Sequence, residues 1–178
     1  MMTLVARRSD TQPGQQPPRP RTEAAVVLGV FLVLGLLGGV VWWLLVDPAT
    51  FTKSARGGAM GEPDLGRQFN ADGWYVVVAA VAGIAAGAVL SWWRARDELL
   101  VTALLVVGAV LAAAVMTFTG QLLGPDDPRA ALTAAAAGGH VAIPLTVSAK
   151  AAYLVWPIGT LIGALLVLWS PQRPDEGD

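Results

Sequence analysis

Four side chains with the capacity for acid–base or metal chemistry lie in two polar segments of this 178-residue chain. Asp126 and Asp127 are adjacent between two prolines, Asp72 stands two residues before a long apolar run, and His140 is the sole histidine. Paired carboxylates can bind a divalent cation, and histidine exchanges protons near neutral pH. These residue types raise three hypotheses: a metal or acid–base site at Asp126 and Asp127, a cation or partner site at Asp72, and a pH sensor at His140.

A structural role is the favoured interpretation at each of these positions. Asp72 is placed to cap the helix that follows it, by accepting hydrogen bonds from the first free amides. Adjacent aspartates in a turn are usually solvated, and a single loop histidine is usually a surface residue. We therefore predict no catalytic, cofactor-binding or metal-binding residue, and no cofactor.

Composition excludes most other chemistry. The chain has no cysteine, which excludes disulfides and thiol catalysis, and one histidine cannot build a multi-histidine metal site. The net charge of −1 argues against nucleic-acid binding. Apolar residues make up 54% of the chain and charged residues 14%, against about 25% charged in a typical soluble domain. With a mean hydropathy of +0.57, this composition predicts an integral protein of a lipid bilayer.

Four uncharged apolar runs connect and position the polar segments. A bilayer core of about 30 Å needs roughly 20 helical residues, and each run is close to or above that length. The runs are continuous rather than alternating, so they predict helices and not barrel strands. The predicted fold is an all-α membrane protein with four transmembrane helices and two extracytoplasmic loops. The helices cover residues 24–46, 74–93, 99–120 and 151–169, the loops 47–73 and 121–150, a disordered Pro/Arg-rich tail 1–23, and a second tail 170–178.

Charged and aromatic residues predict the orientation. With a cytoplasmic amino terminus, the inner segments carry seven of the 12 positive side chains, in a smaller number of residues than the outer loops. Both termini are therefore predicted to lie in the cytoplasm, with the helices in the inner (cell) membrane. An uncleaved first helix is favoured over a cleaved signal sequence, because its apolar run is longer than the usual 7–15 residues. Aromatic rings prefer the two interfaces, so we expect an outer belt of Trp42, Trp43, Trp74, Tyr75, Tyr153 and Trp156 and an inner belt of Trp92, Trp93 and Trp169.

Small residues at four-residue spacing occur in every predicted helix. In lipid, such residues allow two helix backbones to approach closely, and this contact replaces the hydrophobic drive that water supplies. The spacing leaves open whether these faces close one bundle or join a second copy. The short segment 94–98 predicts an antiparallel hairpin of the second and third helices. The packing glycines are Gly35, Gly39, Gly83, Gly87, Gly108, Gly159 and Gly163.

Both outer loops carry signals of local structure. Residues 49–53, followed by a pair of glycines, predict a short strand and turn, and residues 130–137 predict a short helix. Residues 141–149 are extended in character, and Pro144 indicates an edge strand or a bulge there. We expect a small extracytoplasmic cap with β-structure, built from both loops. A re-entrant segment resting on the membrane is the alternative for residues 141–149.

Three segments resemble an uncharacterised family of small actinobacterial four-helix membrane proteins. The stretch Arg67–Trp74 is similar to that family's Q-F-x-A-D-G entry into the second helix, and residues 122–125 and 141–149 are similar to two further family segments. The resemblance covers roughly residues 24–170, and implies four helices with two outer loops and no catalytic residue. The excess of arginine over lysine suits a GC-rich genome such as an actinobacterial one.

The predicted helices contain no acidic, basic or histidine side chain, which argues against an autonomous pump or a haem-binding bundle. The leading hypothesis is a non-enzymatic accessory or scaffold subunit that presents its cap to a membrane-protein partner or envelope component. The alternative is a homo-oligomeric channel or carrier for a small neutral or lipid-like solute, with Thr102, Thr117 and Thr119 at the subunit junction. A third hypothesis is an enzyme that acts on lipid headgroups through the four side chains named first.

Overall fold

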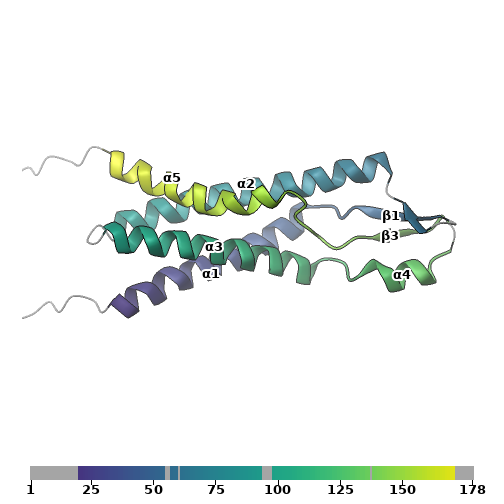
Figure 1. The fold of residues 1–178 in the computed structure, drawn as a ribbon, viewed down its shortest axis with the longest axis horizontal. Helices are drawn as coiled ribbons and strands as arrows, with labels where there is room; N and C mark the ends of the chain where they lie inside the picture. Colours follow the sequence, from purple (N-terminus) through teal and green to yellow (C-terminus); the bar gives the residue numbers. More distant parts are fainter. Residues whose placement is uncertain (1–19, 55–56, 60, 94–97, 137, 171–178) are drawn as a thin grey trace, which may run out of the picture.

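Four long helices form a bundle with a small sheet at one end (Figure 1). The structure, a computed structural model, describes residues 20–54, 57–59, 61–93, 98–136 and 138–170. Four helices are long and apolar enough to cross a membrane, as the sequence predicts, the last of them together with the 3-10 turn that precedes it. The helices are α1 (Pro20–Leu45), α2 (Glu62–Trp93), α3 (Glu98–Leu123) and α5 (Val155–Trp169), with the 3-10 helix η1 (Lys150–Leu154) leading into α5.

Several predicted boundaries differ from the observed ones. Residues 20–23, expected in the amino-terminal tail, are helical and belong to α1. Helix α3 continues past residue 120 to Leu123. Residues 1–19 and 171–178 of the two predicted tails, and residues 94–97 of the predicted turn, lie outside the described residues.

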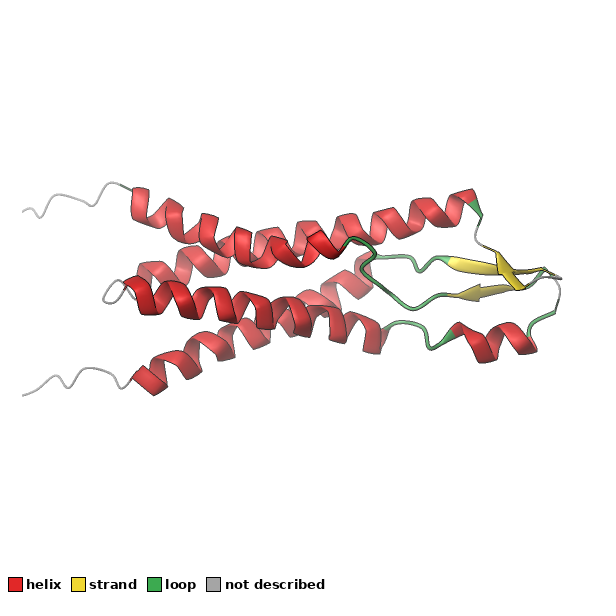
Figure 2. Cartoon of the chain, viewed as in Figure 1, coloured by secondary structure: helices red, strands yellow, loops and turns green. Residues whose placement is uncertain are grey.

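A small layer beyond the ends of α1 and α3 contains the sheet and a short helix (Figure 2). Strands β1 (Thr50–Ser54), β2 (Gly57–Ala59) and β3 (His140–Ala142) form an antiparallel sheet in the order β2-β1-β3. Phe51 pairs with Val141 and Thr52 with His140, so the two loops meet in one sheet. Helix α4 (Pro128–Ala134) lies in the same layer. We call the three strands together with α4 the cap; the first and last described residues lie at the opposite end of the bundle (Figure 1).

Helix α2 begins at Glu62, twelve residues before the expected start at residue 74. Its 32 residues give a length of about 48 Å at 1.5 Å per residue, which exceeds a bilayer core of about 30 Å. Pro63 in the first turn and the acidic side chains of Glu62 and Asp64 favour a helix start there. Asp72 therefore lies inside α2, and the prediction that it caps this helix is wrong.

The helices pack as two pairs, α1 with α3 and α2 with α5. The members of each pair run in the same direction, because one long helix, α2 or α3, lies between them in the chain (Figure 1). The consecutive helices α2 and α3 touch little, so the expected hairpin is not a packing unit. All seven glycines of the predicted packing faces lie at contacts between helices of the same chain, so these faces close one bundle. Gly35, Gly39 and Gly108 lie between α1 and α3, and Gly83, Gly87, Gly159 and Gly163 lie between α2 and α5.

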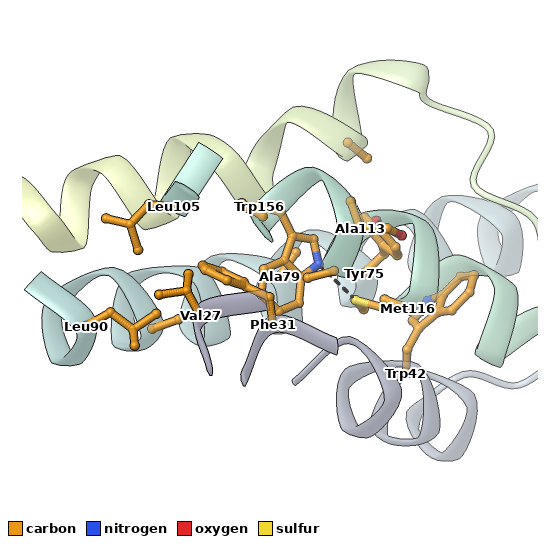
Figure 3. Packing of buried hydrophobic residues seen from close by; sticks show 14 of the residues in the cluster. Val27, Phe31, Trp42, Tyr75, Ala79, Leu90, Leu105, Ala113, Met116 and Trp156 are labelled. Atoms are coloured by element: carbon orange, nitrogen blue, oxygen red, sulfur yellow. Dashed lines mark hydrogen bonds between the residues drawn. The ribbon is translucent and has the colours of Figure 1, made fainter. Parts of the chain in front are cut away.

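Large aromatic side chains fill the centre of the bundle (Figure 3). Trp42, Tyr75 and Trp156 are fully buried, so the prediction that they belong to an interface belt is wrong. Their polar atoms find partners inside, as buried aromatic residues require: the Trp42 Nε1–H donates to the Ala71 carbonyl at 2.8 Å, and the Trp156 Nε1–H to the Met116 Sδ at 3.3 Å. The tryptophans that remain exposed are Trp43, Trp74, Trp92, Trp93 and Trp169.

Candidate functional site

The first three turns of α2 carry three polar side chains at four-residue spacing. Asp64, Gln68 and Asp72 occupy one face of the helix, since residues four apart are neighbours on a helix surface. The same face continues below as Tyr75 and Ala79, which are fully buried in the bundle. One helix face therefore contacts β1 and the segment before η1 in its first three turns, and the bundle core in the turns that follow.

Asp64 joins α2 to the first strand of the cap. Its Oδ1 accepts hydrogen bonds from the Thr50 backbone N–H at 3.1 Å and from the Thr50 hydroxyl at 3.0 Å. The Arg67 guanidinium lies 3.2 Å from the same oxygen. These donors, the Thr50 amide first, hold the pKa of the Asp64 carboxyl below its usual value of 3.8, although partial burial opposes the shift. The carboxylate is thus charged and bound to β1 at neutral pH.

Asp72 joins α2 to the segment that leads into α5. Its two carboxylate oxygens accept from the backbone N–H groups of Ser148, at 2.9 Å, and Ala149, at 3.1 Å. Gln68 adds a hydrogen bond of 2.7 Å to the Ser148 hydroxyl. Ala149 is the N-cap residue of η1 and offers no side-chain cap of its own. Asp72 thus places a negative charge beside the start of another helix, where the helix dipole favours it.

Lys53 and Asp127 hold the short helix α4 at its two ends. The Lys53 ammonium donates to the carbonyls of Thr133, at 3.1 Å, and Ala135, at 2.6 Å, which lie at the carboxyl end of α4. Asp127 is the N-cap residue, and its Oδ1 accepts from the Arg129 N–H at 3.0 Å. Both charges complement the helix dipole. The Asp127 carboxylate therefore stabilises the start of α4, and it is not merely a solvated side chain in a turn.

The remaining two predicted side chains point to different parts of the cap. His140 is exposed on β3, and its Nδ1 lies 3.2 Å from the hydroxyl of Thr52 on β1. Asp126 is exposed before α4. Among the described residues, no group of three or more His, Cys, Asp or Glu side chains could hold a metal ion. Asp72, Asp127 and His140 each contact a different segment of the chain, and the structure does not bring them together.

A narrow crevice lies where the cap meets the bundle. It has a volume of about 30 Å³ and is lined mainly by Val46, Pro48, Arg67, Ala71 and Leu145. A single water needs at least 10–15 Å³ on this scale, so the crevice has room for only two or three water molecules.

Asp64 and Gln68, which share a helix face with Asp72, are not among the predicted site residues. The signal was present in the four-residue spacing of the three side chains, which a helix starting at Glu62 would have made evident. The segment is polar and includes Gly66 and Gly73, which lower helix propensity, so its composition favours a loop.

Comparisons with protein families, with curated proteins and with solved structures find no match to this chain. The relationship to the actinobacterial four-helix family stays a prediction.

Proposed function

We propose that this chain is a multi-pass protein of the inner (cell) membrane, with both termini in the cytoplasm and the cap on the outer side. The support is the large number of exposed apolar side chains, which occur along all four long helices. A soluble monomer rarely exposes apolar patches of more than a few hundred Å². The excess of positive charge in the predicted inner segments supports this orientation.

The proposed role is that of a non-enzymatic accessory or scaffold subunit, which presents the cap to a partner in or near the membrane. The observation that carries this proposal is how the polar side chains of the cap region are used. Asp64 binds the Thr50 main chain and so joins the cap to α2. Lys53 and Asp127 bind main-chain groups at the two ends of α4 within the cap, and Asp72 binds the main chain of the segment that leads into α5. A surface fixed in this way suits recognition, because little conformational freedom is lost when a partner binds.

The surface that the cap offers is polar and carries both signs of charge. Asp126, Arg129 and His140 are exposed on or beside its elements. Mixed charges of this kind favour a protein surface or a polar envelope component over an apolar ligand.

Affinity purification in mild detergent, followed by mass spectrometry, tests the role. The wild-type chain is compared with a variant that carries Asp126→Arg, Arg129→Glu and His140→Glu on the cap, and with a control variant that carries Val107→Leu on the exposed face of α3. The proposal predicts a stoichiometric partner that the cap variant loses and the control keeps. A partner retained by both variants would contradict a role for the cap.

The homo-oligomeric channel or carrier is the second hypothesis, and two of its three threonines are poorly placed for it. Thr117 and Thr119 are buried within one chain, and the Thr117 hydroxyl donates to the Ala113 carbonyl at 2.9 Å. Thr102 is exposed on α3. A polar path at a subunit junction would therefore have to be formed by other residues.

A further inference from the structure

A groove lies between α2 and α5 near their carboxyl ends, at the end of the bundle away from the cap. Its volume is about 310 Å³, which is at the lower end of the range of about 300–1,000 Å³ for small-molecule sites. We call it the α2–α5 groove. Its walls are apolar apart from two indole N–H groups, and the lining residues are Ala88, Val89, Trp92 and Trp93 of α2 and Val167 of α5.

The groove exists because two helices in backbone contact diverge. A methyl group added at Gly163 of α5 would lie 2.9 Å from the Ala88 nitrogen of α2, so the backbones touch at this level. Beyond it, the two helices separate towards their carboxyl ends (Figure 1). Val167 and Trp92 lie about one turn further along, and they line the groove without closing it. Trp92 and Trp93 are 70% and 76% exposed, so the groove is open at its side.

The depth of the groove in a bilayer follows from the helices that form it. The two apolar runs end at Trp93 and Trp169, so in the proposed orientation the groove lies in the last turns before the inner interface. Tryptophan prefers this depth, because its ring is apolar and its N–H is polar. An apolar groove here faces lipid chains and not water. Hydrocarbon is therefore the material that fills it.

Two hydrogen-bond donors stand at the groove. The buried rings of Trp42 and Trp156 donate to acceptors inside the bundle, but the described part of the chain offers no acceptor to the indole N–H of Trp92 or of Trp93. A glycerophospholipid carries ester and phosphate oxygens directly beside its acyl chains, and these oxygens accept hydrogen bonds. Such a lipid thus matches both the apolar walls and the two free donors.

We propose that the α2–α5 groove binds one acyl chain of a glycerophospholipid of the inner leaflet, and that the indole N–H groups of Trp92 and Trp93 donate to ester or phosphate oxygens of the same molecule. This lipid differs from the surrounding bilayer, because it contacts two helices at once and stays with the chain in mild detergent. The proposal rests on the membrane location proposed above and is independent of the scaffold role.

Native mass spectrometry of the full chain in mild detergent, titrated with dioleoylphosphatidylglycerol, tests the site. Val89→Phe places a ring in the groove, and the matched control Val81→Phe makes the same change two turns earlier on α2, at a residue that does not line it. Both valines are exposed, at 49% and 66%, so the bundle accommodates either ring. The wild type and Val81→Phe should bind one lipid per chain. Binding to Val89→Phe should be weaker by about tenfold or more, because excluding even two methylene groups from an apolar site has this effect.

Replacement of the two indoles tests the hydrogen bonds. Trp92→Phe together with Trp93→Phe keeps aromatic rings but removes both donors, and should weaken lipid binding by about twofold to tenfold, whereas Trp43→Phe at the other end of the bundle should not. Equal binding by this double variant and the wild type would overturn the role of the indoles.

Equal lipid binding by Val89→Phe and the wild type would overturn the site itself, as would a wild-type chain that binds no lipid. If Val89→Phe fails to insert, Val167→Phe fills the same groove from α5 and replaces it in the comparison. Sedimentation of the wild-type chain with washed membranes tests the membrane location separately, so failure of the lipid site and failure of the location give different results.

Discussion

Substitution of Gly87 tests the backbone contact that joins α2 to α5. A methyl group at Gly87 would overlap the Thr160 carbonyl of α5, which is backbone and cannot rotate away. Overpacking of a core costs about 1–3 kcal/mol, and the upper end applies where backbone must move. Replacing glycine by alanine inside a helix returns about 1 kcal/mol. We therefore expect Gly87→Ala to lower the free energy of unfolding by about 1–2 kcal/mol.

Gly73→Ala on the same helix is the control. A methyl group there meets nothing within 4 Å, so only the gain in helix propensity remains, and stability should rise by up to about 1 kcal/mol. Reversible unfolding in mixed detergent and sodium dodecyl sulfate, followed by the fluorescence of the seven tryptophans, measures both variants. Equal stability of Gly87→Ala and Gly73→Ala would refute the close backbone contact between α2 and α5.

Three further outcomes follow from the polar contacts. Asp72→Asn should lower the free energy of unfolding by about 1–3 kcal/mol, because a charged acceptor of two backbone amides is lost, while the exposed Asp126→Asn should leave it unchanged in the same assay. The pKa of the Asp64 carboxyl is lowered in the folded state, so its contribution to stability is complete above pH 3.8 and is lost as the pH falls through the lower, folded value. The free energy of unfolding, measured from pH 6 to pH 2, should show this loss in the wild type and not in Asp64→Asn. An identical acid profile for both proteins would contradict this prediction. Thr160→Val should raise the free energy of unfolding by about 1–2 kcal/mol, because the fully buried Thr160 hydroxyl has no hydrogen-bond partner in the described part of the chain. A lower free energy of unfolding in this variant would show that the hydroxyl is bonded.

The four long helices could be predicted because length and hydropathy alone define a segment that can cross a bilayer. The start of α2 could not, because hydropathy does not register a polar helical extension, and Gly66 and Gly73 made it resemble a loop. Pro63 and the acidic first turn favour a start at Glu62, but the hydrogen bonds that hold this polar extension in place, those of Asp64 and Asp72, are contacts with other segments of the chain.

The sequence also could not predict which aromatic side chains point into the bundle and which point outwards. Trp42 and Trp43 are adjacent, yet Trp42 is fully buried and Trp43 is 38% exposed. In water, a polar face would distinguish the outside of a helix from the inside. In these apolar helices both faces are apolar, so periodicity carries little information about which ring faces the core. The sheet was only partly predictable, because β1 and β3 pair across 88 to 92 residues of sequence.

Site-specific photo-crosslinking in living cells tests the central claim most directly, that the cap contacts a partner. A photoreactive amino acid replaces His140, which is exposed on β3, and in a parallel strain Val107, which is exposed on α3. The scaffold account predicts a product between residue 140 and one distinct partner molecule, which is not captured from residue 107. Products that contain only further copies of this chain, formed from residue 107 and not from residue 140, would contradict it and favour the homo-oligomeric channel.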